Sequence, residues 1–146
     1  MRQPDYKRPE SVLVVVHTAR AVLLLRRTDA PDFWQSVTGS LRAGDRIPKD
    51  AACRELMEET GLECTGLKDW HRTYRYEILP AWRHRYAPDV RDNLEHVFSL
   101  ALTEPAAVIL NPREHSEYAW LDFAAAAERA SSWTNREVIE ALARAS

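Results

Sequence analysis

Residues 39–62 read GSLRAGDRIPKDAACRELMEETGL, a loop containing two glycines that leads into a segment rich in glutamate. The second half of this stretch is predicted to form a helix over residues 48–60. Proline is favoured at the first helical position, and Gly61 can adopt the left-handed conformation that commonly ends a helix. The stretch therefore predicts a loop followed by a short helix with defined ends.

Three glutamates of this helix, Glu55, Glu58 and Glu59, are predicted to share one face. At 3.6 residues per turn, Glu55 and Glu59 lie about one turn apart, and Glu58 lies beside them. Like charges at this spacing repel each other by about 0.2–0.5 kcal/mol per pair. Such a face is either simply solvated or neutralised by a cation, and carboxylate oxygens are the ligands that Mg2+ and Mn2+ prefer.

The residues around these glutamates resemble the Nudix box, G-x5-E-x7-R-E-U-x-E-E-x-G-U, where U is a bulky apolar residue. The second half of the box is matched by Arg54, Glu55, Leu56, Glu58, Glu59, Gly61 and Leu62. The first half departs from the pattern, because the first acidic position counted from Gly39 holds Asp45. Eight residues rather than seven then separate Asp45 from Arg54. One residue inserted near Pro48 is expected to alter the start of the helix and to leave the glutamate spacing unchanged.

The rest of the chain alternates apolar runs typical of strands with segments typical of helices. Asp122 is predicted to cap a helix that ends at Arg129, and Thr134 to cap a last helix that ends at Ala143. Strands are predicted over residues 11–17, 21–27, 33–38, 70–79, 94–103 and 117–121, and a loop over residues 80–92. This order predicts an α/β (α+β) fold, an α/β/α sandwich with a central mixed β-sheet, in a single domain over residues 1–146. The Nudix resemblance implies the same fold.

The composition is that of an ordinary soluble globular protein, with 45% apolar and 29% charged residues. The formal net charge of −2 argues against a dedicated nucleic-acid or membrane-surface binder. Cys53 and Cys64 fit no metal-binding spacing, so they are predicted to be reduced thiols in a cytoplasmic protein. No secretory signal or membrane-spanning segment is apparent. The sequence makes no prediction of the oligomeric state.

The Nudix resemblance implies a hydrolase of phosphoanhydride bonds that uses Mg2+, for which Mn2+ can substitute. It implies that Glu55 and Glu59 are metal ligands. Glu58 is either a further ligand or the general base, so Glu58 and Glu59 are the candidate catalytic residues. Nudix enzymes often use another acid from outside the box, and Glu114 is the preferred candidate because a loop acid can move onto a metal. Glu95 and Glu117 are the other candidates, and an ordinary surface role is the alternative for Glu114.

Stretches outside the box are similar to the Nudix enzymes that remove pyrophosphate from 7,8-dihydroneopterin triphosphate in folate synthesis. These stretches are residues 6–9, 32–40, 84–88 and 132–136. The resemblance implies that this small-molecule triphosphate is cleaved to dihydroneopterin monophosphate. Activity on dATP is also expected, because both substrates join a flat heterocycle to a triphosphate.

Basic, aromatic and polar side chains are candidates for binding such a substrate. Arginine and lysine can contact phosphates, and aromatic rings can stack on or border a heterocycle. Phe33 and Trp34 are further aromatic candidates, for which core packing is the alternative. The expected substrate-binding residues are Lys7, Arg26, Thr38, Tyr76, Glu77, Ile78, Leu79, Arg85 and Ser132.

Two other functions are compatible with the box. The first is hydrolysis of other nucleoside or deoxynucleoside polyphosphates by the same chemistry. The second is a Nudix-fold module that senses a nucleotide without cleaving it. Modules of that kind usually lose box carboxylates, whereas this chain retains all three glutamates. Catalysis is therefore the preferred interpretation.

Overall fold

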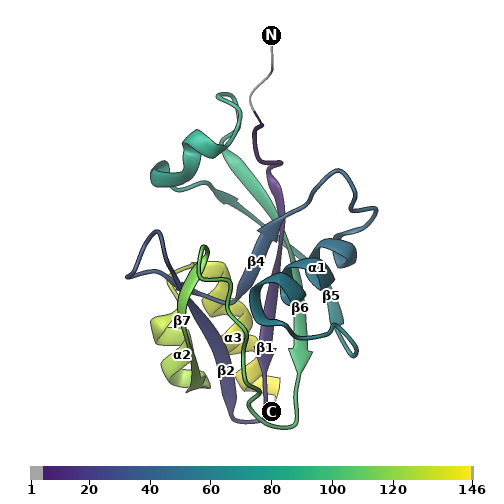
Figure 1. Ribbon diagram of the computed structural model, residues 1–146, viewed down its shortest axis with the longest axis vertical. Helices are drawn as coiled ribbons and strands as arrows, with labels where there is room; N and C mark the ends of the chain where they lie inside the picture. Colours follow the sequence, from purple (N-terminus) through teal and green to yellow (C-terminus); the bar gives the residue numbers. More distant parts are fainter. Residues whose placement is uncertain (1–4, 146) are drawn as a thin grey trace.

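A mixed β-sheet with helices on both faces forms the centre of the protein (Figure 1). The structure is a computed structural model, and it describes residues 5–145; the remaining residues of the expected domain, 1–4 and 146, lie outside this range. Helix α1 (Pro48–Thr60) covers one face of the sheet, and α2 (Phe123–Arg129) and α3 (Trp133–Ala145) cover the other. The predicted α/β/α sandwich is confirmed. Between residues 5 and 145, no helix is both long and apolar enough to cross a membrane.

The sheet has seven strands, five of them in the order β3-β2-β1-β6-β5. Strand β4 also pairs with β1, and β7 pairs with β2. The only parallel pairing among the described strands joins β1 and β6. The strands are β1 (Glu10–His17), β2 (Ala21–Arg27), β3 (Trp34–Gln35), β4 (Val37–Ser40), β5 (Lys68–Glu77), β6 (Asp92–Ala101) and β7 (His115–Asp122).

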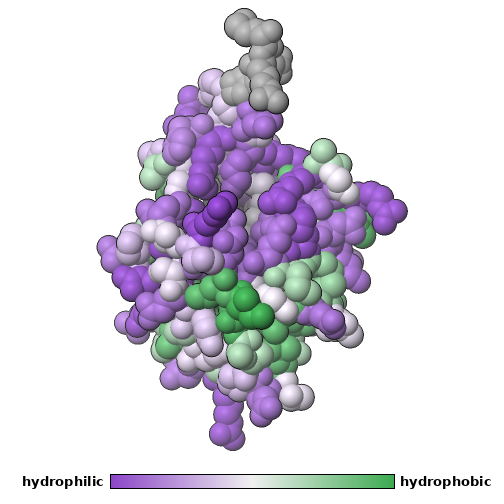
Figure 2. Space-filling model, viewed as in Figure 1, coloured by the Kyte–Doolittle hydropathy of each residue, from purple (hydrophilic) through white to green (hydrophobic). Residues whose placement is uncertain are grey.

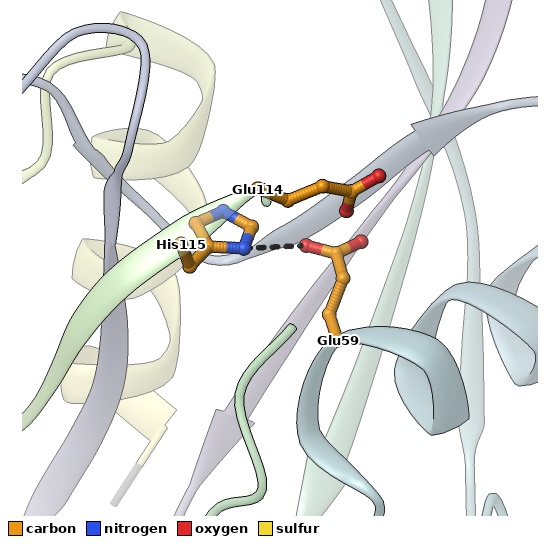
Figure 3. Close-up of side chains that lie close together, drawn as sticks. All are labelled: Glu59, Glu114 and His115. Atoms are coloured by element: carbon orange, nitrogen blue, oxygen red, sulfur yellow. Dashed lines mark ion pairs between the residues drawn. The ribbon is translucent and has the colours of Figure 1, made fainter. Parts of the chain in front are cut away.

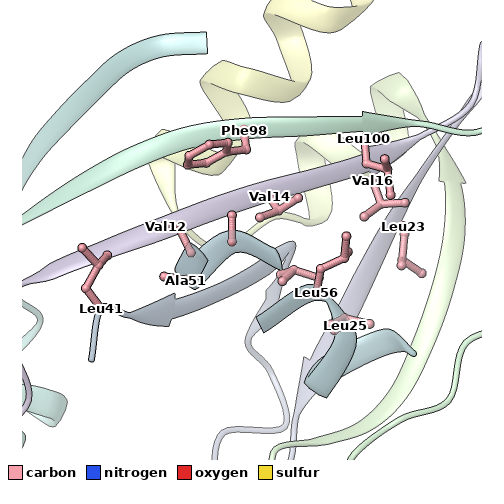
Figure 4. Close-up of a cluster of buried hydrophobic side chains, with 12 residues drawn as sticks. Val12, Val14, Val16, Leu23, Leu25, Leu41, Ala51, Leu56, Phe98 and Leu100 are labelled. Atoms are coloured by element: carbon pink, nitrogen blue, oxygen red, sulfur yellow. The ribbon is translucent and has the colours of Figure 1, made fainter. Parts of the chain in front are cut away.

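Strand β1 lies in the middle of the sheet and supplies side chains to both hydrophobic cores. Successive residues of a strand point to opposite faces. Val12 and Val14 therefore pack under α1 with Leu56 and Phe98, as Figure 4 shows. Leu13 and its neighbours on the opposite face pack against α2 and α3. Each fully buried side chain of this size contributes about 1.5–3 kcal/mol, so burial fixes how α1 sits on the sheet.

Several predicted elements differ in detail, and β5 and β6 each lie two residues earlier in the chain than predicted. The strand predicted over residues 33–38 is interrupted at Ser36, whose backbone N–H donates to the side chain of Asn135 (2.8 Å) instead of pairing with a strand. The predicted loop 80–92 contains the 3-10 helix η1 (Pro80–Arg85). Helix α3 begins at Trp133, so Thr134 lies inside its first turn rather than capping it. The predicted cap Asp122 is confirmed, because its carboxylate accepts a hydrogen bond from the Ala125 N–H (2.7 Å).

Helix α1 has the bounds that the sequence predicts. Gly61 adopts the left-handed conformation (φ 76°), and its N–H donates to the carbonyl of Met57, which closes the helix. At the start of α1, the Asp50 carboxylate accepts a hydrogen bond from the Arg46 N–H (2.9 Å). Ile47, which precedes the first helical residue, makes no side-chain capping bond. The effect of the inserted residue on the start of the helix stays a prediction, and Glu55, Glu58 and Glu59 all lie within α1.

Cys53 and Cys64 form a disulfide, so the prediction of two reduced thiols is wrong for this structure. The chain reverses at Gly61 after α1 and brings Cys64 back beside Cys53. Their Cα atoms are 5.3 Å apart, within the normal range for a disulfide. Spacing alone could not reveal the pair, because the contact depends on that reversal. The bridge ties the middle of α1 to the segment that follows it.

Reduction of this disulfide is expected to lower the stability of the protein. Closing a short loop typically contributes about 2–4 kcal/mol, so the denaturation midpoint should fall when a reductant is added. The unfolding curves of the wild type and of a Cys53→Ala, Cys64→Ala variant would be measured with and without reductant. The variant should not respond to the reductant. An unchanged wild-type midpoint, together with two titratable thiols, would contradict the bridge.

Candidate active site

A cavity of about 1100 Å3 opens between the N-terminal segment, α1, η1 and the start of α3. Figure 2 shows that the surface above α1 and β7 in this view is mostly hydrophilic. Eleven of the thirteen residues preferred from the sequence as catalytic, metal-binding or substrate-binding line the cavity: Lys7, Thr38, Glu55, Glu59, Tyr76, Glu77, Ile78, Leu79, Arg85, Glu114 and Ser132. The fold thus brings together residues that lie far apart in the chain.

Glu59 is the most buried carboxylate of the cavity, with an exposed fraction of 0%. Neither of its carboxylate oxygens has a hydrogen-bond partner within the described part of the chain. Burial raises the pKa of Glu59 well above its usual value, and the neighbouring carboxylates of Glu55 and Glu114 raise it further. A buried carboxylate without a partner is costly, so this position favours either a bound proton or a cation.

Glu114, in the turn before β7, and His115, the first residue of β7, face Glu59 (Figure 3). The possible ligand atoms of Glu59, Glu114 and His115 all lie within 4.8 Å of one another. Glu114 is exposed, and its pKa is raised by partial burial and by the charges of Glu55 and Glu58. The carboxylates of α1 and Glu114 therefore share one electrostatic environment. Hard oxygen ligands in such a cluster fit a divalent cation such as Mg2+ or Mn2+.

His115 is buried, and it contacts Glu59 and Gln35. Burial lowers the pKa of His115 to about 4, so the imidazole is neutral at pH 7. Its Nε2 lies 3.1 Å from the side-chain nitrogen of Gln35, and its Nδ1 lies 3.7 Å from a carboxylate oxygen of Glu59. When the Gln35 amide donates to Nε2, the imidazole proton is on Nδ1 and faces Glu59. In that tautomer the Nδ1–H faces the Glu59 carboxylate at a distance longer than a hydrogen bond.

Arg54 connects the loop before α1 to Glu55. Its guanidinium donates to Glu55 (2.6 Å) and to Asp45 (2.7 Å), and a carboxylate oxygen of Glu58 lies 3.8 Å away. Asp45 also accepts a hydrogen bond from the Arg42 N–H (2.7 Å). The hydrogen bond from Arg54 lowers the pKa of the Asp45 carboxyl. Asp45, which stands at the irregular position of the box, thus fixes the guanidinium of Arg54. Arg54 in turn fixes the carboxylate of Glu55.

Gly39 of β4 lies directly against the side chain of Glu55. A Cβ atom at this position would overlap the Glu55 carboxyl group. No other side chain can therefore occupy position 39 without displacing Glu55. Gly44, the second glycine of the loop, has no atom within 4 Å of such a Cβ. The two glycines of the loop are constrained very differently.

Basic side chains form another part of the cavity wall. Lys7, Arg27 and Arg85 line it, and the pKa of Lys7 is lowered by burial and by the charges of Arg85 and Arg27. Positive side chains held this close together suit a polyanion, because a bound phosphate would relieve their repulsion.

Arg26, which the sequence offered as a phosphate ligand, does not line the cavity. Its guanidinium donates instead to the carbonyl of Pro31 (2.6 Å) and to Glu117 (3.1 Å). The β2–β7 register shifts between Arg26 and Arg27, and Arg27 is the residue that reaches the cavity. Arg27 was not predicted from the sequence, although the alternation of strand side chains separates it from Arg26.

The other acidic and aromatic candidates from the sequence differ in whether they line the cavity. Glu117 pairs with Arg26 outside the cavity, whereas Glu95 lines the cavity from β6. Glu58 does not line the cavity, and its carboxylate lies 3.4 Å from the Arg42 guanidinium. Phe33 lines the cavity, and Trp34 packs into the core with α2 and α3.

Comparison with known proteins identifies close relatives. The NUDIX domain pattern matches residues 7–142. The dihydroneopterin triphosphate diphosphatase of Escherichia coli is 45% identical, with 96% of this chain and 95% of that protein covered. The Haemophilus influenzae protein of the same name is 39% identical, over 93% of this chain and 88% of its own length.

The solved structures agree with the sequence comparison. The E. coli dihydroneopterin triphosphate pyrophosphohydrolase is similar to this chain with a TM-score of 0.88 at 44% identity, covering 94% of this chain and 97% of that one. A Caenorhabditis elegans Ap4A hydrolase complex has a TM-score of 0.68 at 20% identity, covering 92% and 95%. The second likeness shows the fold alone.

Replacing Gly39 by alanine is expected to displace Glu55 and to weaken cation binding. Disturbing a residue that supports a metal site typically costs about 10- to 100-fold in affinity. Titration calorimetry with Mn2+ would measure this loss. Gly44→Ala is the matched control, and its affinity should equal that of the wild type. Equal affinities for the two variants would contradict the close approach of Gly39 to Glu55.

Replacing Glu59 by glutamine is expected to stabilise the metal-free protein above neutral pH. A carboxyl whose pKa is higher in the folded than in the unfolded protein favours folding at low pH and loses this contribution as the pH rises through the folded pKa. In EDTA, Glu59→Gln should therefore melt at least about 2 °C above the wild type at pH 8. The difference should shrink toward pH 5.

Added Mn2+ is the internal control for this measurement. The cation should raise the melting temperature of the wild type much more than that of Glu59→Gln. A variant that melts below the wild type at pH 8 in EDTA would show that the carboxylate of Glu59 is well compensated without metal.

Proposed function

The chain belongs to the Nudix family, and on this basis we propose that it cleaves 7,8-dihydroneopterin triphosphate to dihydroneopterin monophosphate and pyrophosphate. The enzyme acts on a phosphoanhydride bond and depends on a divalent metal ion, which we propose is Mg2+, with Mn2+ as a substitute. Relatives that align over almost the whole chain carry the name of this activity. The proposed catalytic domain spans residues 1–146.

One observation carries the proposal: an acidic cluster and a basic cluster share one cavity. Glu55, Glu59 and Glu114 provide the carboxylates, and Lys7 and Arg85 are among the cations. A triphosphate needs both, since its charge is neutralised by cationic side chains and by metal ions that the carboxylates hold. The orphaned oxygens of Glu59 support its assignment as a metal ligand.

The chain's own residues have distinct parts in the reaction. Lys7, Arg27 and Arg85 bind and orient the phosphates, and Glu55 and Glu59 hold the metal with Glu114. When bound, the metal neutralises charge on the phosphates and lowers the pKa of water.

Three further residues support the reaction. Arg54 keeps the Glu55 side chain in place, and the neutral His115 lies beside Glu59. The proton acceptor is proposed to be Glu58 or Glu59, and Glu58 can also serve as a further ligand from its position beside Arg42.

A second set of residues in the same cavity is proposed to hold the organic part of the substrate. Ile78 is buried, and its N–H donates to the carbonyl of Arg91, which fixes the strand end after β5. Thr38 is anchored to the Val12 carbonyl through its hydroxyl (2.8 Å). The proposed members of this set are Thr38, Tyr76, Glu77, Ile78, Leu79 and Ser132.

The expected cytoplasmic location remains part of the proposal. Reducing conditions in the cytosol keep most cysteines as thiols. The bridge between Cys53 and Cys64 would therefore have to resist reduction in that compartment, which the reductant experiment above addresses.

An assay with Mg2+ that identifies the products tests the proposed reaction. Dihydroneopterin triphosphate should release pyrophosphate, with a kcat/KM at least about tenfold above those of dATP and dGTP. Orthophosphate as the first product, or equal kcat/KM for the nucleotides, would overturn the assignment. Equal values would favour the alternative, a hydrolase of general nucleoside polyphosphates. Binding without any cleavage would favour a nucleotide-sensing module.

Glu59→Gln is expected to reduce kcat/KM by at least about 100-fold, because an essential metal ligand and candidate base is lost. Glu117→Gln is the matched control, since Glu117 pairs with Arg26 outside the cavity. Its kcat/KM should stay within about twofold of the wild type, as expected for a surface ion pair. Wild-type release of pyrophosphate by Glu59→Gln would remove Glu59 from the catalytic machinery.

A further inference from the structure

The cavity contains a second buried carboxylate, Glu95, that the proposed chemistry does not use. Glu95 is 4% exposed and lies on β6, next to β1 and β5 in the sheet. Val97, two residues further along the same strand, packs with the core under α3. Glu95 therefore points to the α3 side of the sheet, whereas Glu59 projects from α1 on the other side. The cavity is lined from both faces.

Two buried side-chain oxygens around Glu95 have no hydrogen-bond donor. The hydroxyl of Thr134 bonds to the Glu95 carboxylate, and Oε1 of Glu95 has no partner among residues 5–145. Asn93, two residues earlier on the same face, donates its amide to Ser11 (2.7 Å) and Tyr76 (3.1 Å). Its own Oδ1 is also buried and without a donor among the described residues. This part of the cavity therefore offers two unused acceptors.

We propose that Glu95 is a specificity-determining residue that accepts hydrogen bonds from the amino-pyrimidinone edge of the substrate's ring. This inference rests on the proposed function and concerns the same cavity. A 2-amino-4-oxo-pyrimidine ring carries a ring N–H and an exocyclic amino group side by side. A carboxylate can accept from both, as charge-assisted hydrogen bonds.

The same chemistry discriminates between rings. Adenine places a ring nitrogen with a lone pair next to its amino group. That lone pair would face the Glu95 carboxylate, so only one of the two hydrogen bonds could form. Glu95 thus favours the ring of dihydroneopterin triphosphate over that of dATP.

Aromatic residues beside Glu95 suit a flat ring. Trp133 lines the cavity and is 50% exposed, although its ring is large and apolar. Its edge packs on Tyr74, with ring centroids 5.5 Å apart, which holds the indole in place. Trp133 immediately precedes Thr134, so the first turn of α3 supplies both an aromatic face and the hydroxyl that orients Glu95.

Burial raises the pKa of Glu95 to about 7 in the ligand-free protein. The charged form is thus disfavoured by the fold itself, and glutamine is a neutral side chain of the same shape. Glu95→Gln is therefore expected to fold, and to melt no lower than the wild type at pH 8. This melting temperature is the control for any loss of binding.

Substrate preference is the primary test. In Glu95→Gln, the ratio of kcat/KM for dihydroneopterin triphosphate to that for dATP should fall about 10- to 100-fold, mainly through KM. Trp133→Ala should lower kcat/KM for both substrates without a comparable change in their ratio. Glu117→Gln should leave the ratio unchanged. An unchanged ratio in Glu95→Gln would overturn the inference.

A binding measurement separates this inference from the proposed function. Neopterin, which has the ring but no phosphate, would be titrated in EDTA and followed by its fluorescence. Weaker binding by Glu95→Gln than by the wild type supports ring recognition even if dihydroneopterin triphosphate is not cleaved. Equal binding by the two proteins overturns ring recognition even if the substrate is cleaved as proposed.

Discussion

The burial of the Glu59 carboxylate without a compensating partner is the constraint on which the rest of the site depends. Hydrophobic packing of α1 on the sheet, through Leu56 and its neighbours, carries Glu59 beneath the surface. The interior cannot solvate the charge, and the nearest titratable groups are other carboxylates and a neutral histidine. The cost of burying this charge lowers the stability of the metal-free protein. The same cost is relieved when a cation binds, so it raises the affinity for the cation.

The neighbours of Glu59 keep the cluster from relaxing. Arg54 is held by Asp45 and in turn holds Glu55, while the absence of a side chain at Gly39 lets Glu55 approach β4. The irregular loop before α1 is thus compatible with an ordered cluster, because Asp45 reaches Arg54 despite the inserted residue. Cation binding needs ligands that are already placed, and these contacts place them before any metal arrives.

Much of this arrangement follows from local rules, and the remainder depends on contacts between distant segments. The ends of α1 and the left-handed Gly61 were predictable from proline and glycine preferences. The disulfide was not, because it forms only after the chain reverses. Arg27 was missed because strand alternation separates it from Arg26 but does not show which of the two borders the cavity.

The position of Glu95 in the cavity could not be predicted from the sequence, for a different reason. Glu95 was predicted to lie on a strand, and it does, although β6 begins and ends two residues earlier than predicted. The sequence could not show that the cavity extends along that face of the sheet, because this depends on where α3 begins. Thr134 was expected to cap α3, but it lies in the first turn and bonds to Glu95.

Strand β4 has only four residues and pairs with β1 alone among the described strands, and the cavity passes its end at Ser40. A single continuous space can therefore reach the α1 side and the α3 side of one sheet. The sheet then acts as a fixed spacer between the carboxylates of α1 and the acceptors of β6. A ligand must be long enough to span this distance if it is to contact both the α1 carboxylates and the β6 acceptors. The fold therefore selects substrates by length as well as by chemistry. Residues at the β6 end of the cavity can also change without altering the α1 end. The same fold can therefore bind a different ring while it cleaves the same kind of bond.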